Sequence, residues 1–234
     1  MGRPGPERRR RRVMDDLADL VKAATSSGWA VGSARLYQLR SRALALGWEE
    51  LATRKGDGAV SVLRPTAAED AHPRSLSAVH GLGQQPLHTD GAHLQEPPDI
   101  VILHAAEPNG TPTLLWSETS TITNPAYPRI ARPPCLAGGI FVVASGSNRF
   151  LASAYDDRGG YRYDPGCMTP ADERAHEAVR HFESLAGGAY RQEWTASDQV
   201  LVIRNRRTLH ARAAVAEDDG DRQLTRIAYR VPGR

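Results

Sequence analysis

The residues of this 234-residue chain with the clearest chemical potential are two histidines and one aspartate. His88 and Asp90 lie two positions apart in the segment PLHTDGAH. Side chains alternate along a strand, so both would point to the same face. His210 lies far downstream, shortly after the apolar run 200–203. If the fold brings His210 beside the pair, two imidazoles and one carboxylate form the facial triad that holds non-haem Fe(II) and leaves coordination positions open.

Two arginines near the end of the chain add to this hypothesis, because a His-x-Asp tripeptide alone arises by chance in many proteins. Arg222 and Arg226 lie four residues apart in the segment RQLTR, on what we expect to be a final, inward-facing strand. With a period of two they share a face. Buried guanidinium groups are costly unless each meets an anion, and a carboxylate is the natural bidentate partner.

The order of four segments resembles a known family. The segments are HTD (88–90), GTPTLLWS (110–117), VLVIRNRRTLHAR (200–212) and RQLTR (222–226). Over roughly residues 75–231 the chain resembles the taurine dioxygenase-like (TauD/TfdA) superfamily of Fe(II)- and 2-oxoglutarate-dependent oxygenases. The resemblance implies a mostly β fold with flanking helices, namely a double-stranded β-helix (a cupin-like jelly roll).

The resemblance also implies roles for individual residues. The metal ligands and catalytic residues would be His88, Asp90 and His210, holding Fe(II). Thr113, in a GTPT segment that departs from the more usual Gly-Gly-Asp-Thr, and Arg222 would bind the distal carboxylate of 2-oxoglutarate. For the primary substrate, the resemblance implies contacts with Arg226, through an acidic group, and with Gln84.

The activity implied is a dioxygenase reaction that consumes O₂ and 2-oxoglutarate and releases succinate and CO₂. Hydroxylation is the expected outcome, with desaturation and cyclisation left open. The substrate expected is a small molecule, such as an amino acid or a specialised metabolite in biosynthesis. Asp90 provides a carboxylate where related halogenases have a small residue, so halogenation is not expected.

Three other interpretations stay open at this point. The same chemistry could act on a protein side chain or a nucleic-acid base. The trio could serve a zinc or other metal hydrolase, although this leaves the Arg222 and Arg226 pair unexplained. The chain could also be a non-catalytic metal-binding jelly roll.

Composition indicates a soluble, cytoplasmic protein. The net charge is +3, and much of the basic excess lies in Arg8 to Arg12. No aromatic residues are interleaved with this run, so a solvated segment is favoured over a nucleic-acid contact. Two cysteines without a secretory signal are typical of reduced thiols. No apolar run is long enough for a membrane span, and the oligomeric state is left open.

Periodicity predicts two helices near the N-terminus, at 13–25 and 34–46, and a third at 170–186 with Thr169 as its N-cap. Short apolar runs predict strands at 60–63, 99–106, 113–117, 139–145, 200–205 and 225–231. We therefore expect an N-terminal basic segment with helices at 1–58, packing on a catalytic domain at 59–234. That domain is expected to carry a lid-like insert around 118–166.

Overall fold

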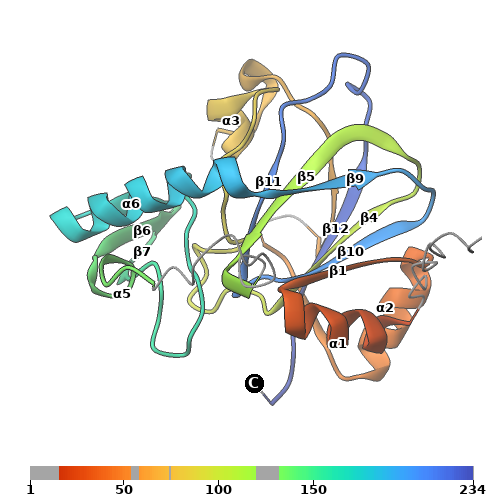
Figure 1. Ribbon diagram of the computed structural model, residues 1–234, viewed down its shortest axis with the longest axis horizontal. Helices are drawn as coiled ribbons and strands as arrows, with labels where there is room; N and C mark the ends of the chain where they lie inside the picture. The colour runs from red at the N-terminus through yellow and green to blue at the C-terminus, as the bar shows by residue number, and fades with distance from the viewer. Residues whose placement is uncertain (1–15, 54–57, 74, 120–131, 234) are drawn as a thin grey trace, which may run out of the picture.

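The computed structural model describes residues 16–53, 58–73, 75–119 and 132–233. The described chain is mostly β-sheet with several helices (Figure 1). Its helices are α1 (Leu17–Ser27), α2 (Leu36–Ala45), α3 (Leu76–His80), α5 (Cys135–Gly138) and α6 (Glu173–Leu185), with 3₁₀ turns η1 (Ala68–Asp70) and η2 (Ala186–Gly188). Its strands are β1 (Trp29–Ser33), β2 (Glu49–Leu51), β3 (Val60–Leu63), β4 (Ile100–Ala105), β5 (Asn109–Ser117), β6 (Phe141–Ser145), β7 (Asn148–Ala152), β8 (Met168–Pro170), β9 (Tyr190–Trp194), β10 (Gln199–Arg204), β11 (Thr208–Arg212) and β12 (Leu224–Arg230).

Three antiparallel sheets organise these strands. The largest has six strands in the order β1-β10-β4-β12-β2, with β3 also paired to β12. A second sheet has the order β11-β5-β9, and a third has the order β7-β6-β8. All six predicted strand regions are strands. The sequence missed β1, β2, β7, β8, β9 and β11.

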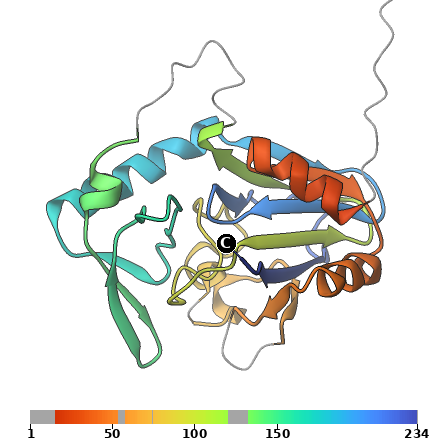
Figure 2. The same ribbon diagram turned by 90° about the horizontal axis from the view of Figure 1, so that it is seen from below.

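The core lies in layers, because side chains on each strand alternate between two faces. On β4, Ile100 and Ile102 pack with α1 and α2, which cover the outer face of the large sheet (Figure 2). Val101 and Leu103, on the opposite face, pack with Leu115 of β5 between the two larger sheets. The far face of the β11-β5-β9 sheet packs against α6 and the small sheet. Polar side chains that point inward from the two larger sheets would therefore meet in the space between them, where a functional site could form.

The first helix ends two residues beyond the predicted end at residue 25. Asp16 caps the start of α1 by accepting a hydrogen bond from Ala18 N at 2.7 Å. Gly28 ends the helix in the left-handed region, with φ of +92°. The Gly28 carbonyl accepts a hydrogen bond from Thr208 Oγ1 at 2.9 Å, which links the end of α1 to β11. The predicted start at residue 13 lies outside the described residues.

The third predicted helix begins later than expected. Asp172, and not Thr169, is the N-cap of α6, since its carboxylate accepts from Ala175 N at 2.7 Å. Thr169 and Pro170 belong to β8 instead, where they pair with β6. Asp and Thr are both good N-cap residues, so capping preference does not exclude Thr169. Thr169 pairs with β6 instead, and the helix therefore begins after Asp172.

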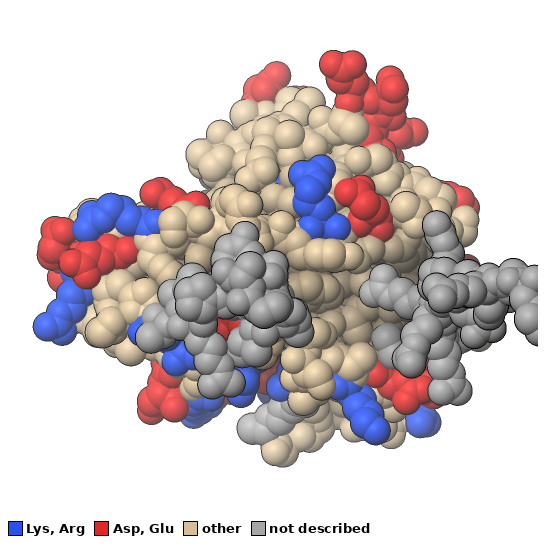
Figure 3. Space-filling model, viewed as in Figure 1, with Lys and Arg blue, Asp and Glu red and all other residues tan. Residues whose placement is uncertain are grey.

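The proposed division at residue 58 stays a prediction. The described part of the N-terminal segment supplies β1 and β2 to the large sheet and packs α1 and α2 on its face. The insert around 118–166 contains α5, β6 and β7, and its residues 120–131 lie outside the described chain, as does the run Arg8 to Arg12. On the face seen in Figure 3, acidic and basic side chains are interspersed. None of the helices described is long and apolar enough to cross a membrane.

Candidate active site

The two histidines and the aspartate predicted as metal ligands lie together in the structure. The backbones of His88 and His210 pair directly, each N–H donating to the other carbonyl at 3.0 Å. Their Nε2 atoms approach Asp90, at 3.7 Å from Oδ1 for His88 and 3.8 Å from Oδ2 for His210. One ligand atom from each residue lies within 4.8 Å of the others, and Asp90 and His210 are buried.

The local backbone explains how Asp90 joins this cluster. His88 makes one isolated bridge to β11, and the chain then turns, with Gly91 at φ of +67°. Any side chain on Gly91 would collide with Pro98, because a Cβ there would lie 2.7 Å from its Cδ. The segment is thus a short bridge followed by a turn, rather than the longer strand that the His-x-Asp spacing suggested.

Asn205 fixes the backbone of Asp90 and was missed by sequence reasoning. Its Nδ2 donates to the carbonyls of Asp90 and Pro98, both at 2.9 Å, and its Oδ1 accepts from Asp90 N at 3.0 Å. The side chain is fully buried. In the sequence it is one polar residue in the turn after an apolar strand, and nothing there points to a partner 115 positions away.

The donor atoms fit a divalent metal ion. The Nδ1 of His88 lies 3.1 Å from the carbonyl of Pro86, an arrangement that orients the ring and leaves its Nε2 lone pair for a metal. The Oδ2 of Asp90 and the Nδ1 of His210 are buried without a hydrogen-bond partner among the described residues. Buried polar atoms are almost always paired, so an unpaired carboxylate oxygen beside two imidazoles fits the coordination of a cation.

The electrostatics keep the Asp90 carboxylate charged. Burial alone would raise its pKa, but the Arg226 guanidinium and the nearby His210 and His88 rings hold the pKa well below its ordinary value. Burial lowers the pKa of His210, and the charge of His88 adds to that effect. For His88, burial is outweighed by Asp90 and Asp164, which raise its pKa. A charged carboxylate and a neutral His210 are the states that bind a metal.

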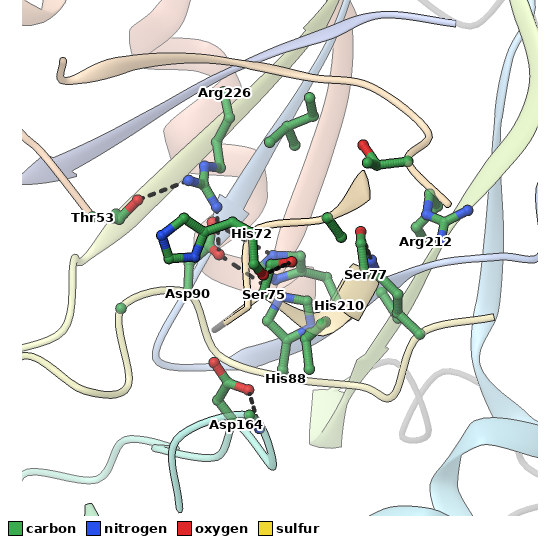
Figure 4. A pocket seen from close by; sticks show the side chains of 18 of the residues that line it. Thr53, His72, Ser75, Ser77, His88, Asp90, Asp164, His210, Arg212 and Arg226 are labelled. Atoms are coloured by element: carbon green, nitrogen blue, oxygen red, sulfur yellow. Dashed lines mark hydrogen bonds and ion pairs between the residues drawn. The ribbon is translucent and has the colours of Figure 1, made fainter. Parts of the chain in front are cut away.

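A cavity of about 650 Å³ opens on this cluster (Figure 4). Thr113, Arg222 and Arg226 all line it, and their roles in binding 2-oxoglutarate and substrate stay predictions. Thr113 Oγ1 accepts from Trp194 Nε1 at 3.1 Å, which leaves its own hydroxyl hydrogen to donate. Burial lowers the pKa of Arg222 to about 10, partly offset by Asp219, so the guanidinium is still charged at neutral pH. Its Nε donates to Asn109 Oδ1 at 3.2 Å.

Arg226 points at the triad. Its Nη1 lies 3.0 Å from Asp90 Oδ1, and its Nη2 donates to Thr53 Oγ1 at 2.8 Å. The dashed lines in Figure 4 trace this path from Thr53 through Arg226 to Asp90. Sequence reasoning placed Arg226 in the pocket but did not foresee its contact with a predicted metal ligand.

Gln84 does not line the cavity, whereas the next residue does. Gln84 is exposed, and Gln85 faces the cavity with its Nε2 donating to Ser77 Oγ at 3.3 Å. Because residues 84–87 form no regular strand, the alternation through His88 does not extend back to Gln84. His93 also lines the cavity. Sequence reasoning missed further lining residues from the loops, including His72, Ser75 and Asp164.

Solved structures of non-haem iron oxygenases have a similar architecture. An asparagine oxygenase in complex with Fe(II), 2S,3S-3-hydroxyasparagine and succinate matches with a TM-score of 0.68 and 17% identity, over 91% of this chain and 77% of that chain. OrfP in complex with Fe and alpha-ketoglutaric acid matches with a TM-score of 0.63 and 19% identity, over 90% and 77%. The chain has the fold of these oxygenases.

PvcB, an Fe- and alpha-ketoglutarate-dependent oxygenase from an isonitrile synthetic pathway, shares this oxygenase fold. The PvcB protein of Pseudomonas aeruginosa matches with a TM-score of 0.61 and 20% identity, over 95% of this chain and 86% of that chain. By sequence, no protein-family model and no curated protein matches the chain.

Proposed function

We propose that this chain is an Fe(II)- and 2-oxoglutarate-dependent oxygenase built on a double-stranded β-helix. The observation that carries the proposal is the buried cluster of His88, Asp90 and His210 at a cavity that also contains the buried charge of Arg222. A metal hydrolase would use the cluster but has no need for Arg222. A non-catalytic metal site would need no cavity of this volume.

In this proposal the three side chains hold iron through His88 Nε2, His210 Nε2 and one oxygen of Asp90. Bound iron supplies the activation of O₂ that is coupled to conversion of 2-oxoglutarate to succinate and CO₂. The chain contributes the orientation of the ligands, through the Pro86 carbonyl and the Asn205 side chain. Asp90 occupies the third ligand position, so the expected product carries oxygen or a new unsaturation and no halogen.

Arg222 and Thr113 are the proposed partners of the distal carboxylate of 2-oxoglutarate. Both line the cavity, and both side chains are buried. Thr113 has its hydroxyl hydrogen available, because Trp194 already donates to its oxygen. A buried guanidinium that is only partly matched by Asp219, whose Oδ2 lies 3.9 Å away, favours an incoming anion.

The substrate class we propose is a small zwitterion such as an amino acid. The cavity wall carries a carboxylate, Asp164, and a cation, Arg226, so it offers a partner for each charged group. Asp164 Oδ1 accepts from Gly166 N at 2.8 Å, which holds the carboxylate and leaves its second oxygen for a ligand. The complexes of two neighbours contain 3-hydroxyasparagine and (3S)-hydroxy-L-Arg, which supports this class.

Succinate formation tests the proposal. The purified protein with Fe(II), 2-oxoglutarate and O₂ is offered a panel of amino acids and their N-acetyl and amide derivatives. We expect at least one amino acid to raise succinate release well above the substrate-free rate, with loss of the effect in His210→Ala. Stimulation by nucleic acids or peptides alone would overturn the substrate class.

A cytoplasmic location is part of the proposal and is supported by the two free thiols, Cys135 and Cys167. The division into a segment at 1–58 and a catalytic domain at 59–234 is likewise proposed. Thr53, from the segment, reaches the site through Arg226, so both parts would be needed for activity.

A further inference from the structure

The two carboxylate oxygens of Asp90 have different surroundings. Oδ1 accepts a charge-assisted hydrogen bond from Arg226 Nη1 at 3.0 Å. Oδ2 is buried and has no hydrogen-bond partner among the described residues, and it is the oxygen nearest to His210 Nε2. One oxygen is therefore engaged by the protein, and the other is left for a metal.

The guanidinium that engages Oδ1 is itself held in place. Arg226 lies on β12 opposite Leu103 of β4 and Ser61 of β3, which fixes the position of its backbone inside the large sheet. Its side chain is 11% exposed, and its Nη2 donates to Thr53 Oγ1 at 2.8 Å. A planar guanidinium bound at two of its nitrogens has little freedom to rotate, so it can act as a rigid support.

We infer that Arg226 is a positioning residue for the metal ligand Asp90, and that Thr53 holds Arg226 in the orientation this requires. The inference rests on the proposed function. By occupying Oδ1, Arg226 keeps Asp90 as a ligand through Oδ2 alone and prevents the carboxylate from turning or chelating through both oxygens. Hydrogen bonds to a ligating carboxylate orient the ligand and commonly change metal affinity.

This role differs from the one that the family resemblance implied for Arg226. A residue that only meets an acidic group of the substrate acts when substrate is present. A residue that orients Asp90 acts on metal binding before 2-oxoglutarate or substrate arrives. Arg226 uses Nη1 for Asp90 and Nη2 for Thr53, and the two roles are separated by measuring metal binding alone.

The test is a Co(II) titration of the full-length, metal-free protein without 2-oxoglutarate or substrate, followed by calorimetry and by visible absorption of the bound ion. Arg226→Met is expected to weaken Co(II) binding roughly 10- to 100-fold and to change the absorption spectrum, because Oδ1 becomes free to coordinate. Arg226→Lys keeps the charge but cannot reach both partners, so it should be intermediate. Arg230→Met, an equivalent change on the same strand at an exposed pair with Glu49, is the matched control and should bind as wild type does.

Thr53→Val keeps the test decisive if Arg226→Met does not fold. It removes one hydroxyl and leaves the guanidinium, and we expect a loss of Co(II) affinity smaller than that of Arg226→Met, under about tenfold. Wild-type affinity and an unchanged spectrum in a folded Arg226 variant, or in Thr53→Val if no Arg226 variant folds, would overturn the inference while leaving the proposed function intact. Failure of wild type to bind Co(II) at the triad, with no difference from His210→Ala, would overturn both.

Discussion

Asn205 and Asp90 exchange two hydrogen bonds across 115 positions of sequence: Asp90 N donates to Asn205 Oδ1, and Asn205 Nδ2 donates back to the Asp90 carbonyl. The Asn205 side chain forms hydrogen bonds with the backbone of Asp90, as the backbone of a neighbouring strand would. It pairs with the backbone just after the bridge between His88 and His210, and so it fixes the backbone that carries the Asp90 carboxylate.

Replacing Asn205 should therefore damage both stability and metal binding. Asn205→Ala leaves the buried amide of Asp90 and two carbonyls unpaired, so we expect a loss of at least about 2 kcal/mol in the free energy of unfolding. Urea denaturation measures it, and Co(II) affinity should fall as well. Asn148→Ala, at an exposed position on β7, is the control and should change stability by less than about 0.5 kcal/mol. Equal stability of the two variants would contradict this reading of Asn205.

Arg222 should contribute to 2-oxoglutarate binding and should not affect metal binding. Arg222→Met removes a buried charge that is expected to form charge-assisted hydrogen bonds, so 2-oxoglutarate should bind roughly 10- to 100-fold more weakly to the Co(II)-loaded protein. Co(II) affinity in the absence of 2-oxoglutarate should stay as in wild type. Loss of Co(II) affinity with 2-oxoglutarate binding retained would show that Arg222 has been assigned the wrong role.

The lowered pKa of Asp90 gives the metal-free protein a defined dependence on pH. The carboxylate faces Arg226, His88 and His210, and its folded pKa lies below the ordinary value of 3.8. The unfolded chain thus takes up this proton at a higher pH than the folded chain does. The stabilisation is fully present above the unfolded pKa and is lost as the pH falls through the folded pKa.

The measurement is urea unfolding of wild type and Asp90→Asn in chelator, from about pH 6 down to about pH 3. Wild type should be the more stable at the upper end, and its advantage should shrink as the pH falls. An advantage that grows toward acid would mean that the carboxylate is not stabilised in its charged form.

Gly28 should tolerate no side chain, for reasons of both backbone and space. A Cβ there would lie 2.9 Å from Ser117 Cβ and would also collide with Thr208 Oγ1, in a residue with φ of +92°. Gly47 has a similar φ of +74° but meets only Pro232, at 3.8 Å. Gly28→Ala should therefore cost roughly 2 kcal/mol more than Gly47→Ala in urea denaturation. Equal losses in the free energy of unfolding would mean that the contacts around Gly28 can shift to accommodate a side chain.

The sequence predicted the parts of the site that depend on short spacing. His88 and Asp90 are two residues apart, and Thr113 and Arg226 lie on the predicted strands β5 and β12, whose successive side chains point to opposite faces of the sheet. The apolar runs of β4 and β10 were recognisable because these strands are buried along nearly their whole length. Local patterns carry this information because the strand period is a property of the chain itself.

The sequence could not predict contacts that depend on distant pairing. The bond from Arg226 to Thr53 joins residues 173 positions apart, and no local pattern marks either residue as the partner of the other. β1 and β9 were missed because WAVGS and YRQEW alternate weakly, and their pairing with β10 and β5 makes them strands. Gln85, and not the predicted Gln84, lines the cavity. The residues before His88 form no regular strand, so the alternation of side chains does not extend back to Gln84.

The most direct test of iron and 2-oxoglutarate binding at this site is the visible absorption of the protein after anaerobic addition of Fe(II) and then 2-oxoglutarate. If His88, Asp90 and His210 hold iron and leave positions open for the co-substrate, a metal-to-ligand charge-transfer band should appear only when both are present. The band should be absent in His210→Ala and should require much more 2-oxoglutarate in Arg222→Met. A folded wild-type protein that binds Fe(II) and shows no such band at saturating 2-oxoglutarate would contradict the proposal that 2-oxoglutarate binds to iron at this site.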